Sequence, residues 1–140
     1  MPGSQPVASD VTDAQRLVRL LAHATYERVD KPWGTEHMLT LPNDGGIIKV
    51  IHVRAHAATS LQHHVVKEEV TYVLESDGVR GGVHVEDQTW MKHVRSGEHV
   101  HLKPGTVHRT VGSCLLLEAT TPENYDVVRH ADDYGRASRG

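Results

Sequence analysis

The sequence lacks several features that would mark a secreted or membrane protein. It has one cysteine, no phenylalanine, and no apolar run near the roughly 20 residues that a membrane-spanning helix needs. Cys114 has no partner for an intrachain disulfide and precedes three leucines, so we expect a buried thiol in a reducing compartment. The stretch from Met1 to Asp10 shows neither the positive start nor the apolar core of a signal peptide. These absences favour a soluble, cytoplasmic protein without a membrane partner.

The charged residues form no block of one sign. The chain has 15 basic and 18 acidic residues and a formal net charge of −3, and no basic stripe is interleaved with aromatic side chains. Proteins that bind nucleic acid usually carry such a stripe because they must neutralise phosphates. A nucleic-acid partner is therefore not expected.

The length of 140 residues suits one domain with a single core. Residues 1–9 contain two prolines, a glycine and two serines, which predicts a flexible tail before a domain over residues 10–140. Thr12 followed by Gln15 matches a capping box, and apolar residues then recur at helical spacing. These patterns predict one amphipathic helix over about residues 12–25.

Residues 35–120 show short β-branched runs separated by turn sequences such as Ser76-Asp77-Gly78. Because no second helical pattern follows, the spacing predicts an all-β antiparallel sandwich or jelly-roll barrel, with a C-terminal extension over residues 121–140. The expected strands are 35–41, 46–53, 59–64, 68–75, 79–86, 89–94, 98–102, 106–111 and 114–120.

Two stretches of these strands carry potential metal ligands. Gln62 and His64 are two residues apart, so in a strand their side chains share a face, while Glu69 opens the next apolar run. A fourth candidate, His108, follows the turn at Pro104-Gly105. One amide oxygen, one carboxylate and two imidazoles suit a divalent transition metal with open positions, which leaves zinc, manganese, iron, nickel and cobalt as candidates.

These motifs resemble those of the cupin superfamily, in particular the cupin domain of type II phosphomannose isomerase/mannose-1-phosphate guanylyltransferase. The matching phrases, in the family's order, are Lys31-Pro32-Trp33-Gly34, Ser60-Leu61-Gln62, Gly105-Thr106-Val107-His108-Arg109 and Asp132-Asp133-Tyr134-Gly135-Arg136. The resemblance covers about residues 26–136. It implies a double-stranded β-helix that holds one divalent metal ion through Gln62, His64, Glu69 and His108.

The sequence also departs from this family at the expected mouth of the pocket. Val65 and Val66 stand where family members tend to carry histidines followed by an arginine. Gly112 replaces a common asparagine, and Ser76 replaces a glycine. These departures leave the expected fold and metal set unchanged, and they leave the substrate open.

The resemblance implies interconversion of an aldose and a ketose sugar phosphate, as in mannose 6-phosphate isomerase. Such chemistry needs an ion that polarises a carbonyl, a proton carrier, and cationic side chains for the phosphate. Glu118, which lies within an apolar strand, is the candidate proton carrier, and Lys49 is a candidate for a catalytic or a phosphate-binding role. Arg109, Lys31 and Arg129 are the candidate substrate ligands because such cations bind phosphate oxygens well.

Alternatives remain open from sequence alone. The same ion could serve an oxygenase, cyclase or lyase acting on a small organic molecule, or the domain could bind a sugar without turnover. His63, His99 or His101 could replace one of the four ligands. The amphipathic helix and the exposed sheet edges favour a homodimer.

Overall fold

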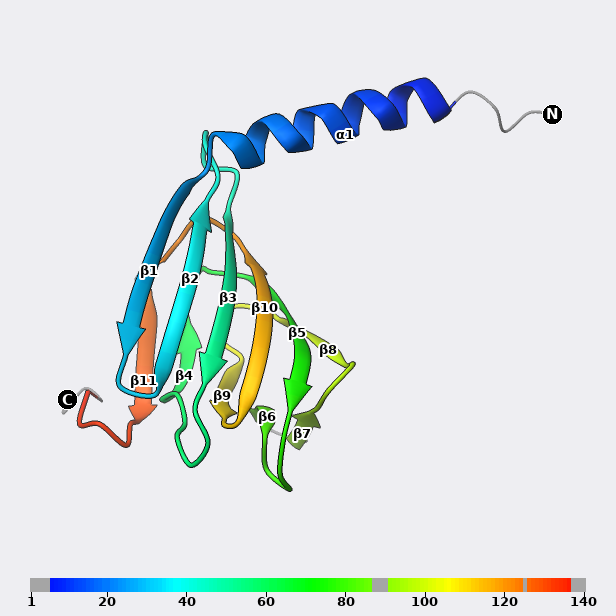
Figure 1. Ribbon diagram of the computed structural model, residues 1–140. Coiled ribbons are helices and arrows are strands. Elements are labelled where there is room, and N and C mark those ends of the chain that lie inside the picture. Colours follow the sequence, from blue (N-terminus) through cyan, green and yellow to red (C-terminus); the bar gives the residue numbers. More distant parts are fainter. Residues whose placement is uncertain (1–5, 87–90, 125, 137–140) are drawn as a thin grey trace.

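The computed structural model describes residues 6–86, 91–124 and 126–136, and in this part of the chain one helix precedes eleven strands (Figure 1). The helix α1 spans Pro6–Ala22. The strands are β1 (Thr25–Lys31), β2 (Gly34–Thr40), β3 (Ile47–Val53), β4 (Leu61–His64), β5 (Glu69–Ser76), β6 (Gly82–Glu86), β7 (Met91–Val94), β8 (His99–Leu102), β9 (Val107–Val111), β10 (Cys114–Thr120) and β11 (Val127–Ala131).

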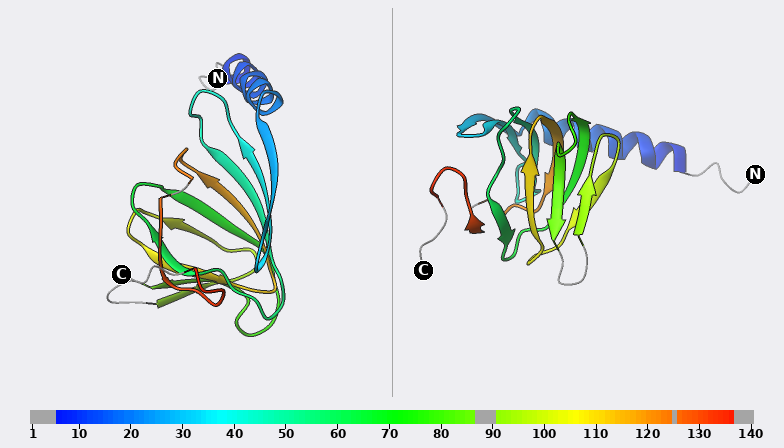
Figure 2. Two further views of the ribbon diagram at one scale, coloured as in Figure 1. Left: turned by 90° about the vertical axis from the view of Figure 1, so that its left-hand side faces the viewer. Right: turned by 90° about the horizontal axis from the view of Figure 1, so that it is seen from below.

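The strands form two antiparallel sheets that face each other at an angle (Figure 2). One sheet has six strands in the order β1-β2-β3-β10-β5-β8, and the other has five in the order β11-β4-β9-β6-β7. The core lies between them: Val73 and Leu116 come from the six-stranded sheet, and Val83, Val85 and Val94 from the other. Two antiparallel sheets with one helix confirm the expected all-β class.

Strand β3 shows how the sequence pattern positions the site. Every second side chain of β3 is buried, because successive residues of a strand point to opposite faces of its sheet. The inward row contains Ile47, Ile51 and Val53, but also Lys49, which is only 6% exposed. Folding therefore carries an ammonium group into the space between the sheets.

Each predicted strand overlaps one in the structure, although residues 89–90 lie outside the described residues. Two further strands, β1 and β11, were not predicted.

The helix begins at Pro6, within the expected tail, and ends at Ala22, because Thr25 already pairs with Thr40 of β2. Residues 1–5 and 137–140, which belong to the expected tail and C-terminal extension, lie outside the described residues. Cys114 is buried in the core, as expected.

Helix α1 projects away from both sheets instead of covering one of them (Figure 1). Its described side chains, from Thr12 to Ala22, are all exposed to solvent. The two residues His23 and Ala24 connect it to β1. Among the described residues, no helix is long and apolar enough to cross a membrane.

Candidate metal centre

A cavity of about 220 Å³ opens between the two sheets. Its walls come from β1, β2 and β3, from β4, β5, β9 and β10, and from the segment around β11. Eight of the nine residues proposed from sequence line it: Lys31, Lys49, Gln62, His64, Glu69, His108, Glu118 and Arg129. Arg109 is the exception.

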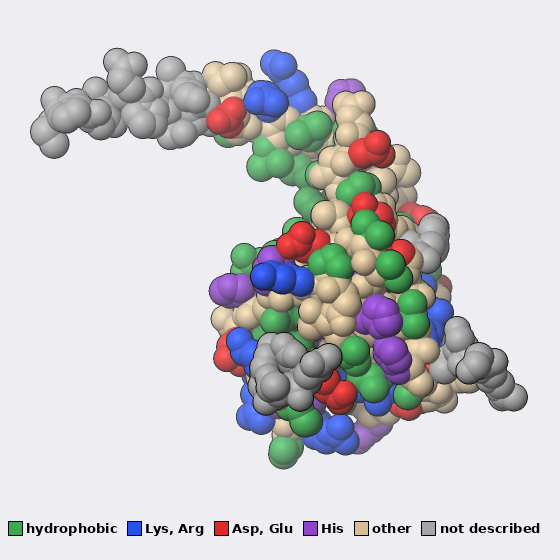
Figure 3. All heavy atoms as spheres, turned by 180° about the vertical axis from the view of Figure 1, so that it is seen from behind, with side chains coloured by type: hydrophobic (Ala, Val, Ile, Leu, Met, Phe, Trp, Pro, Cys, Tyr) green, Lys and Arg blue, Asp and Glu red, His purple; other side chains and the backbone are tan. Residues whose placement is uncertain are grey.

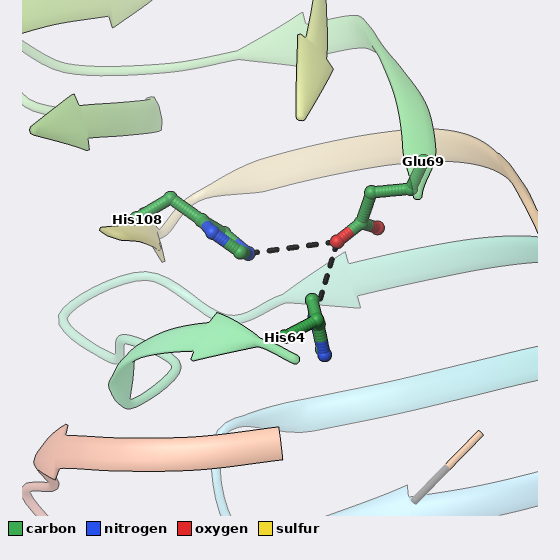
Figure 4. Close-up of side chains that lie close together, drawn as sticks. All are labelled: His64, Glu69 and His108. Atoms are coloured by element: carbon green, nitrogen blue, oxygen red, sulfur yellow. Dashed lines mark ion pairs between the residues drawn. The ribbon is translucent and has the colours of Figure 1, made fainter. Parts of the chain in front are cut away.

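Three buried side chains from three strands meet in this cavity (Figure 4). Oε1 of Glu69, at the start of β5, lies 3.1 Å from Nε2 of His64, at the end of β4. The same oxygen lies 3.6 Å from Nε2 of His108, on β9. Four ligand atoms placed tetrahedrally around zinc with bonds of about 2.1 Å are roughly 3.4 Å apart. The spacing of the three atoms therefore suits one shared ion.

An oxygen atom lies near the outer ring nitrogen of each histidine. Nδ1 of His108 donates to the carbonyl oxygen of Thr106 at 2.9 Å. Nδ1 of His64 lies 3.3 Å from Oδ1 of Asp126, within ion-pair distance, although neither of these two atoms makes a hydrogen bond of standard geometry. The other carboxylate oxygen of Asp126 accepts the backbone N–H groups of Val66 and Lys67 at 2.7 and 2.8 Å. Carboxylates and carbonyls behind metal-bound histidines fix the ring and its tautomer in this way.

This arrangement leaves three lone pairs facing one point. With Nδ1–H directed outward, a neutral His64 or His108 presents the unprotonated Nε2 toward Oε1 of Glu69. That oxygen is buried and makes no hydrogen bond of standard geometry. Three electron-rich atoms at these distances repel one another unless a cation lies between them. The residues therefore fit a divalent metal ion.

The charge states suit the same ion. Burial alone would raise the pKa of Glu69, but contact with His64 and the positive charge of Lys67 outweigh burial and hold the pKa well below its usual value. Burial lowers the pKa of His108, which favours the neutral ring. A carboxylate and a neutral imidazole are the forms that bind metals.

Gln62 lies on the cavity wall directly across from His108 in the β4–β9 pairing. Its amide oxygen accepts a hydrogen bond from the buried hydroxyl of Ser60 at 2.6 Å. A role for Gln62 as the fourth ligand stays a prediction. The other histidines considered as replacements lie outside the cavity: His63 contacts His130, His99 stacks on Tyr72, and His101 contacts Glu68.

Glu118 and Lys49 lie side by side on the cavity wall, as directly paired residues of β10 and β3. The carboxyl group of Glu118 hydrogen-bonds to Glu69. Burial, together with the negative charge of Glu69, raises the pKa of Glu118 well above its usual value. Lys49 pairs with Glu36 of β2 at 3.6 Å. A carboxyl group with a raised pKa thus lies next to the three side chains that could bind a metal.

Cations from β1 and the C-terminal segment form another part of the wall, namely Lys31, Arg129 and Arg136. Nε of Arg129 is buried without a hydrogen-bond partner. Arg109 lies on β9 next to His108 and points the opposite way. Its guanidinium donates to the carbonyl oxygen of Thr59 at 3.1 Å and pairs with Asp133 at 3.4 Å.

Sequence reasoning missed two residues that lie near the cluster of His64, Glu69 and His108. Lys67 is only 4% exposed and lines the cavity close to Glu69. Asp126 lies near His64 from the expected C-terminal extension over residues 121–140. The position of Lys67, two residues before Glu69, was a usable signal, because a charged residue between His64 and Glu69 in the sequence is brought close to both. No local pattern pointed to Asp126.

No protein-family model matches the chain, and no curated protein matches it in sequence. Solved structures do resemble it. A variant of Streptomyces PAC13 with uridine matches with a TM-score of 0.62 and 14% identity, over 76% of this chain and 86% of that one. Mannose 6-phosphate isomerase from Bacillus subtilis matches with a TM-score of 0.60 and 13% identity, over 79% of this chain and 60% of that one.

The capsular polysaccharide assembling protein CapF from Staphylococcus aureus matches with a TM-score of 0.58 and 14% identity. That match covers 75% of this chain but only 34% of CapF, so the chain spans about a third of CapF's length. Likeness at such low identities concerns the fold alone. The fold that the chain shares with these proteins is the cupin fold.

Proposed function

We propose that the chain is a metal-dependent enzyme that interconverts the aldose and ketose forms of a small sugar phosphate. The observation that carries this proposal is the contact between Glu118 and Glu69, which puts a proton-holding acid beside the His64–Glu69–His108 cluster in one cavity. Aldose–ketose isomerisation needs a group that moves a proton between two neighbouring carbons. A second group next to this proton carrier must polarise the substrate oxygens bonded to those two carbons.

His64, Glu69 and His108 would hold the ion, with Gln62 as a fourth ligand. When bound, a divalent ion acts as a Lewis acid on a substrate carbonyl. With the negative charge of Glu69 offset by an ion, one cause of the raised pKa of Glu118 would be removed, and Glu118 would release its proton to solvent. Its carboxylate would then take the proton from the carbon next to the carbonyl and return it to the neighbouring carbon. Lys67, buried in the same wall, would face the negative charge that develops on the substrate oxygens.

A phosphate group would lie against Lys31 and Arg129. Both cations line the cavity, and Nε of Arg129 has no hydrogen-bond partner within the protein. The likeness to mannose 6-phosphate isomerase supports this class of substrate at the level of fold. We assign Arg109 to structure, since its guanidinium is occupied by Thr59 and Asp133.

Conversion of fructose 6-phosphate to mannose 6-phosphate by the metal-loaded protein tests the proposal. The rate should vanish with a chelator and in His64→Ala, and His63→Ala is the matched control because that ring lies outside the cavity. Metal-loaded protein that converts no sugar phosphate would contradict the isomerase assignment.

A second candidate keeps the ion and changes the reaction. Val65 and Val66 follow His64 and are 58% and 57% exposed, so a less polar organic substrate would find apolar contacts there. The similar PAC13 structure contains uridine, a molecule with both a sugar and an aromatic base. Oxygen uptake, cyclisation or elimination on such a substrate, without isomerase activity, would favour this candidate. Binding of the ligand without any turnover would favour a non-catalytic sugar-binding domain.

A further inference from the structure

An ion pair that the proposed reaction does not use lies on the wall of the cavity. Nζ of Lys49 on β3 is 3.6 Å from Oε2 of Glu36 on β2, and the two side chains are only 7% and 13% exposed. Both line the cavity that contains the cluster of three potential metal ligands. Many other acidic and basic side chains are scattered over the surface, as on the face shown in Figure 3, where water solvates them. This pair is enclosed by the fold instead.

Both charged groups of the pair can still form hydrogen bonds. Their separation of 3.6 Å is longer than the roughly 2.7–3.2 Å of an N–H···O hydrogen bond. Among the described residues, no hydrogen bond involves Nζ of Lys49 or the carboxylate of Glu36. The N–H donors of the ammonium and the acceptor oxygens of the carboxylate are therefore available to a ligand in the cavity.

The pair lies among apolar side chains of the six-stranded sheet. Glu36 is directly between Val29 of β1 and Ile51 of β3 in the strand register, and Lys49 is directly opposite Met38 of β2. All of these side chains line the cavity. Removing two opposite charges from water can cost more than their attraction returns, so a buried ion pair is weak evidence for a role in stability. A ligand that hydrogen-bonds to both groups would offset this cost.

The pair also lies close to the proposed proton carrier. Lys49 of β3 is directly opposite Glu118 of β10, on strands about 4.8 Å apart. Glu36 is on β2, which adjoins β3 on the side away from β10. When the two reacting carbons of a sugar lie beside Glu118, the carbons that follow can extend along this wall to Lys49 and Glu36.

We propose that Glu36 and Lys49 bind a hydroxyl group of the sugar, on a carbon beyond the two that exchange the carbonyl. This inference rests on the proposed isomerase function and names the residues that select its substrate. A hydroxyl group can donate its hydrogen to the carboxylate of Glu36 while its oxygen accepts from the ammonium of Lys49. The pair would therefore select sugar phosphates that carry a free hydroxyl between the reacting carbons and the phosphate.

Other chemical groups fit the pair less well. A phosphate or carboxylate would be repelled by the charge of Glu36, and an amine by that of Lys49. An apolar ligand would leave both charged groups without water and without hydrogen bonds. The pair fits a neutral group that both donates and accepts, and hydroxyl groups are the groups of this kind that a sugar carries.

Binding of fructose 6-phosphate and of its 3-deoxy, 4-deoxy and 5-deoxy analogues to the zinc-loaded chain, measured by calorimetry, tests the proposal. At least one analogue should bind about 10- to 100-fold more weakly than fructose 6-phosphate, because losing its hydroxyl leaves the charged groups unpaired. The double variant Glu36→Leu/Lys49→Met replaces the pair by apolar side chains. It should weaken binding of fructose 6-phosphate by a similar factor and leave the affinity for that analogue nearly unchanged.

Controls separate this role from a structural one. The double variant should keep its zinc content and should resist urea at least as well as the original chain, because no unpaired charge is left in the wall. Asp30→Asn, which breaks the exposed ion pair with Arg28, should leave all four affinities unchanged. If the double variant does not fold, Glu36→Gln gives the same comparison with a side chain of unchanged size.

The outcomes distinguish this inference from the proposed function. Equal affinity of the original chain for all four ligands, or equal weakening of all four in the variant, would overturn the inference. The isomerase assignment would stand in that case if fructose 6-phosphate is still converted. A zinc-loaded chain that binds none of the four ligands would overturn both.

Discussion

Glu118 of β10 and Glu69 of β5 lie on neighbouring strands and close enough inside the cavity for each carboxyl group to shift the pKa of the other. Their pKa values move apart: that of Glu118 rises with burial and the nearby negative charge, whereas the contact with His64 and the charge of Lys67 hold that of Glu69 below its usual value despite burial. One acid is thus kept neutral beside one that stays ionised. Such divergence separates a proton carrier from a metal ligand.

Glu118→Gln should separate catalysis from metal binding. Glutamine keeps the size and can still donate to Glu69, but it cannot transfer a proton, so kcat should fall by about 100- to 10,000-fold. Elemental analysis should find the same metal content as in the unsubstituted protein. Full activity in Glu118→Gln would show that another group moves the proton.

Asp126→Asn should weaken the metal centre from behind. The amide oxygen can still accept the backbone N–H groups of Val66 and Lys67, but the negative charge next to Nδ1 of His64 is lost. Removing such a partner typically lowers metal affinity by about 10- to 100-fold. Competition with a coloured chelator measures the affinity. Asp133→Asn, which removes an exposed carboxylate that contacts Arg109, is the matched control and should leave affinity unchanged.

The Asp132–Arg136 pair should contribute a pH-dependent part of the stability. Hydrogen bonds from Arg136 hold the pKa of Asp132 below its usual value of 3.8. A carboxylate with a lowered folded-state pKa stabilises the fold above the unfolded-state pKa, and this contribution is lost as the pH falls through the folded-state pKa. Asp132→Asn should therefore lower the free energy of unfolding by about 1 kcal/mol at pH 7, with a smaller difference below about pH 3.8. Urea unfolding at both pH values gives the two differences, and equal differences would contradict this explanation.

The thiol of Cys114 should be inert in the folded protein. Burial raises its pKa to about 12, and the reactive form of cysteine is the thiolate. A coloured disulfide reagent at pH 8 should label the chain only after denaturant is added. Rapid labelling of the native chain would mean that β10 opens locally.

Sequence reasoning succeeded for candidate site residues that follow the two-residue periodicity of a strand. The spacing of Gln62 and His64, with Glu69 and His108, placed these residues on inward rows, because side chains of a strand alternate strictly. Strand β1 was missed because its inward residues, among them Glu27 and Lys31, line the polar cavity and show no apolar alternation.

Local sequence patterns could not predict the contact of Asp126 with His64 or the direction of Arg109. Asp126 reaches His64 only because β11 pairs with β4 across a long interval of sequence. Arg109 was grouped with the substrate ligands on residue type, whereas its place next to His108 on one strand sends it to the opposite face. Both relationships depend on strand pairing, which a single sequence specifies weakly.

The metal content of the protein tests the central claim most directly. After equilibration with zinc, manganese or cobalt and removal of free metal, elemental analysis should find about one ion per chain. Glu69→Gln and His108→Ala should lose it, while His63→Ala should keep it. A chain that binds none of these ions, or Glu69→Gln and His108→Ala variants that bind as much as the original, would contradict a metal centre formed by His64, Glu69 and His108.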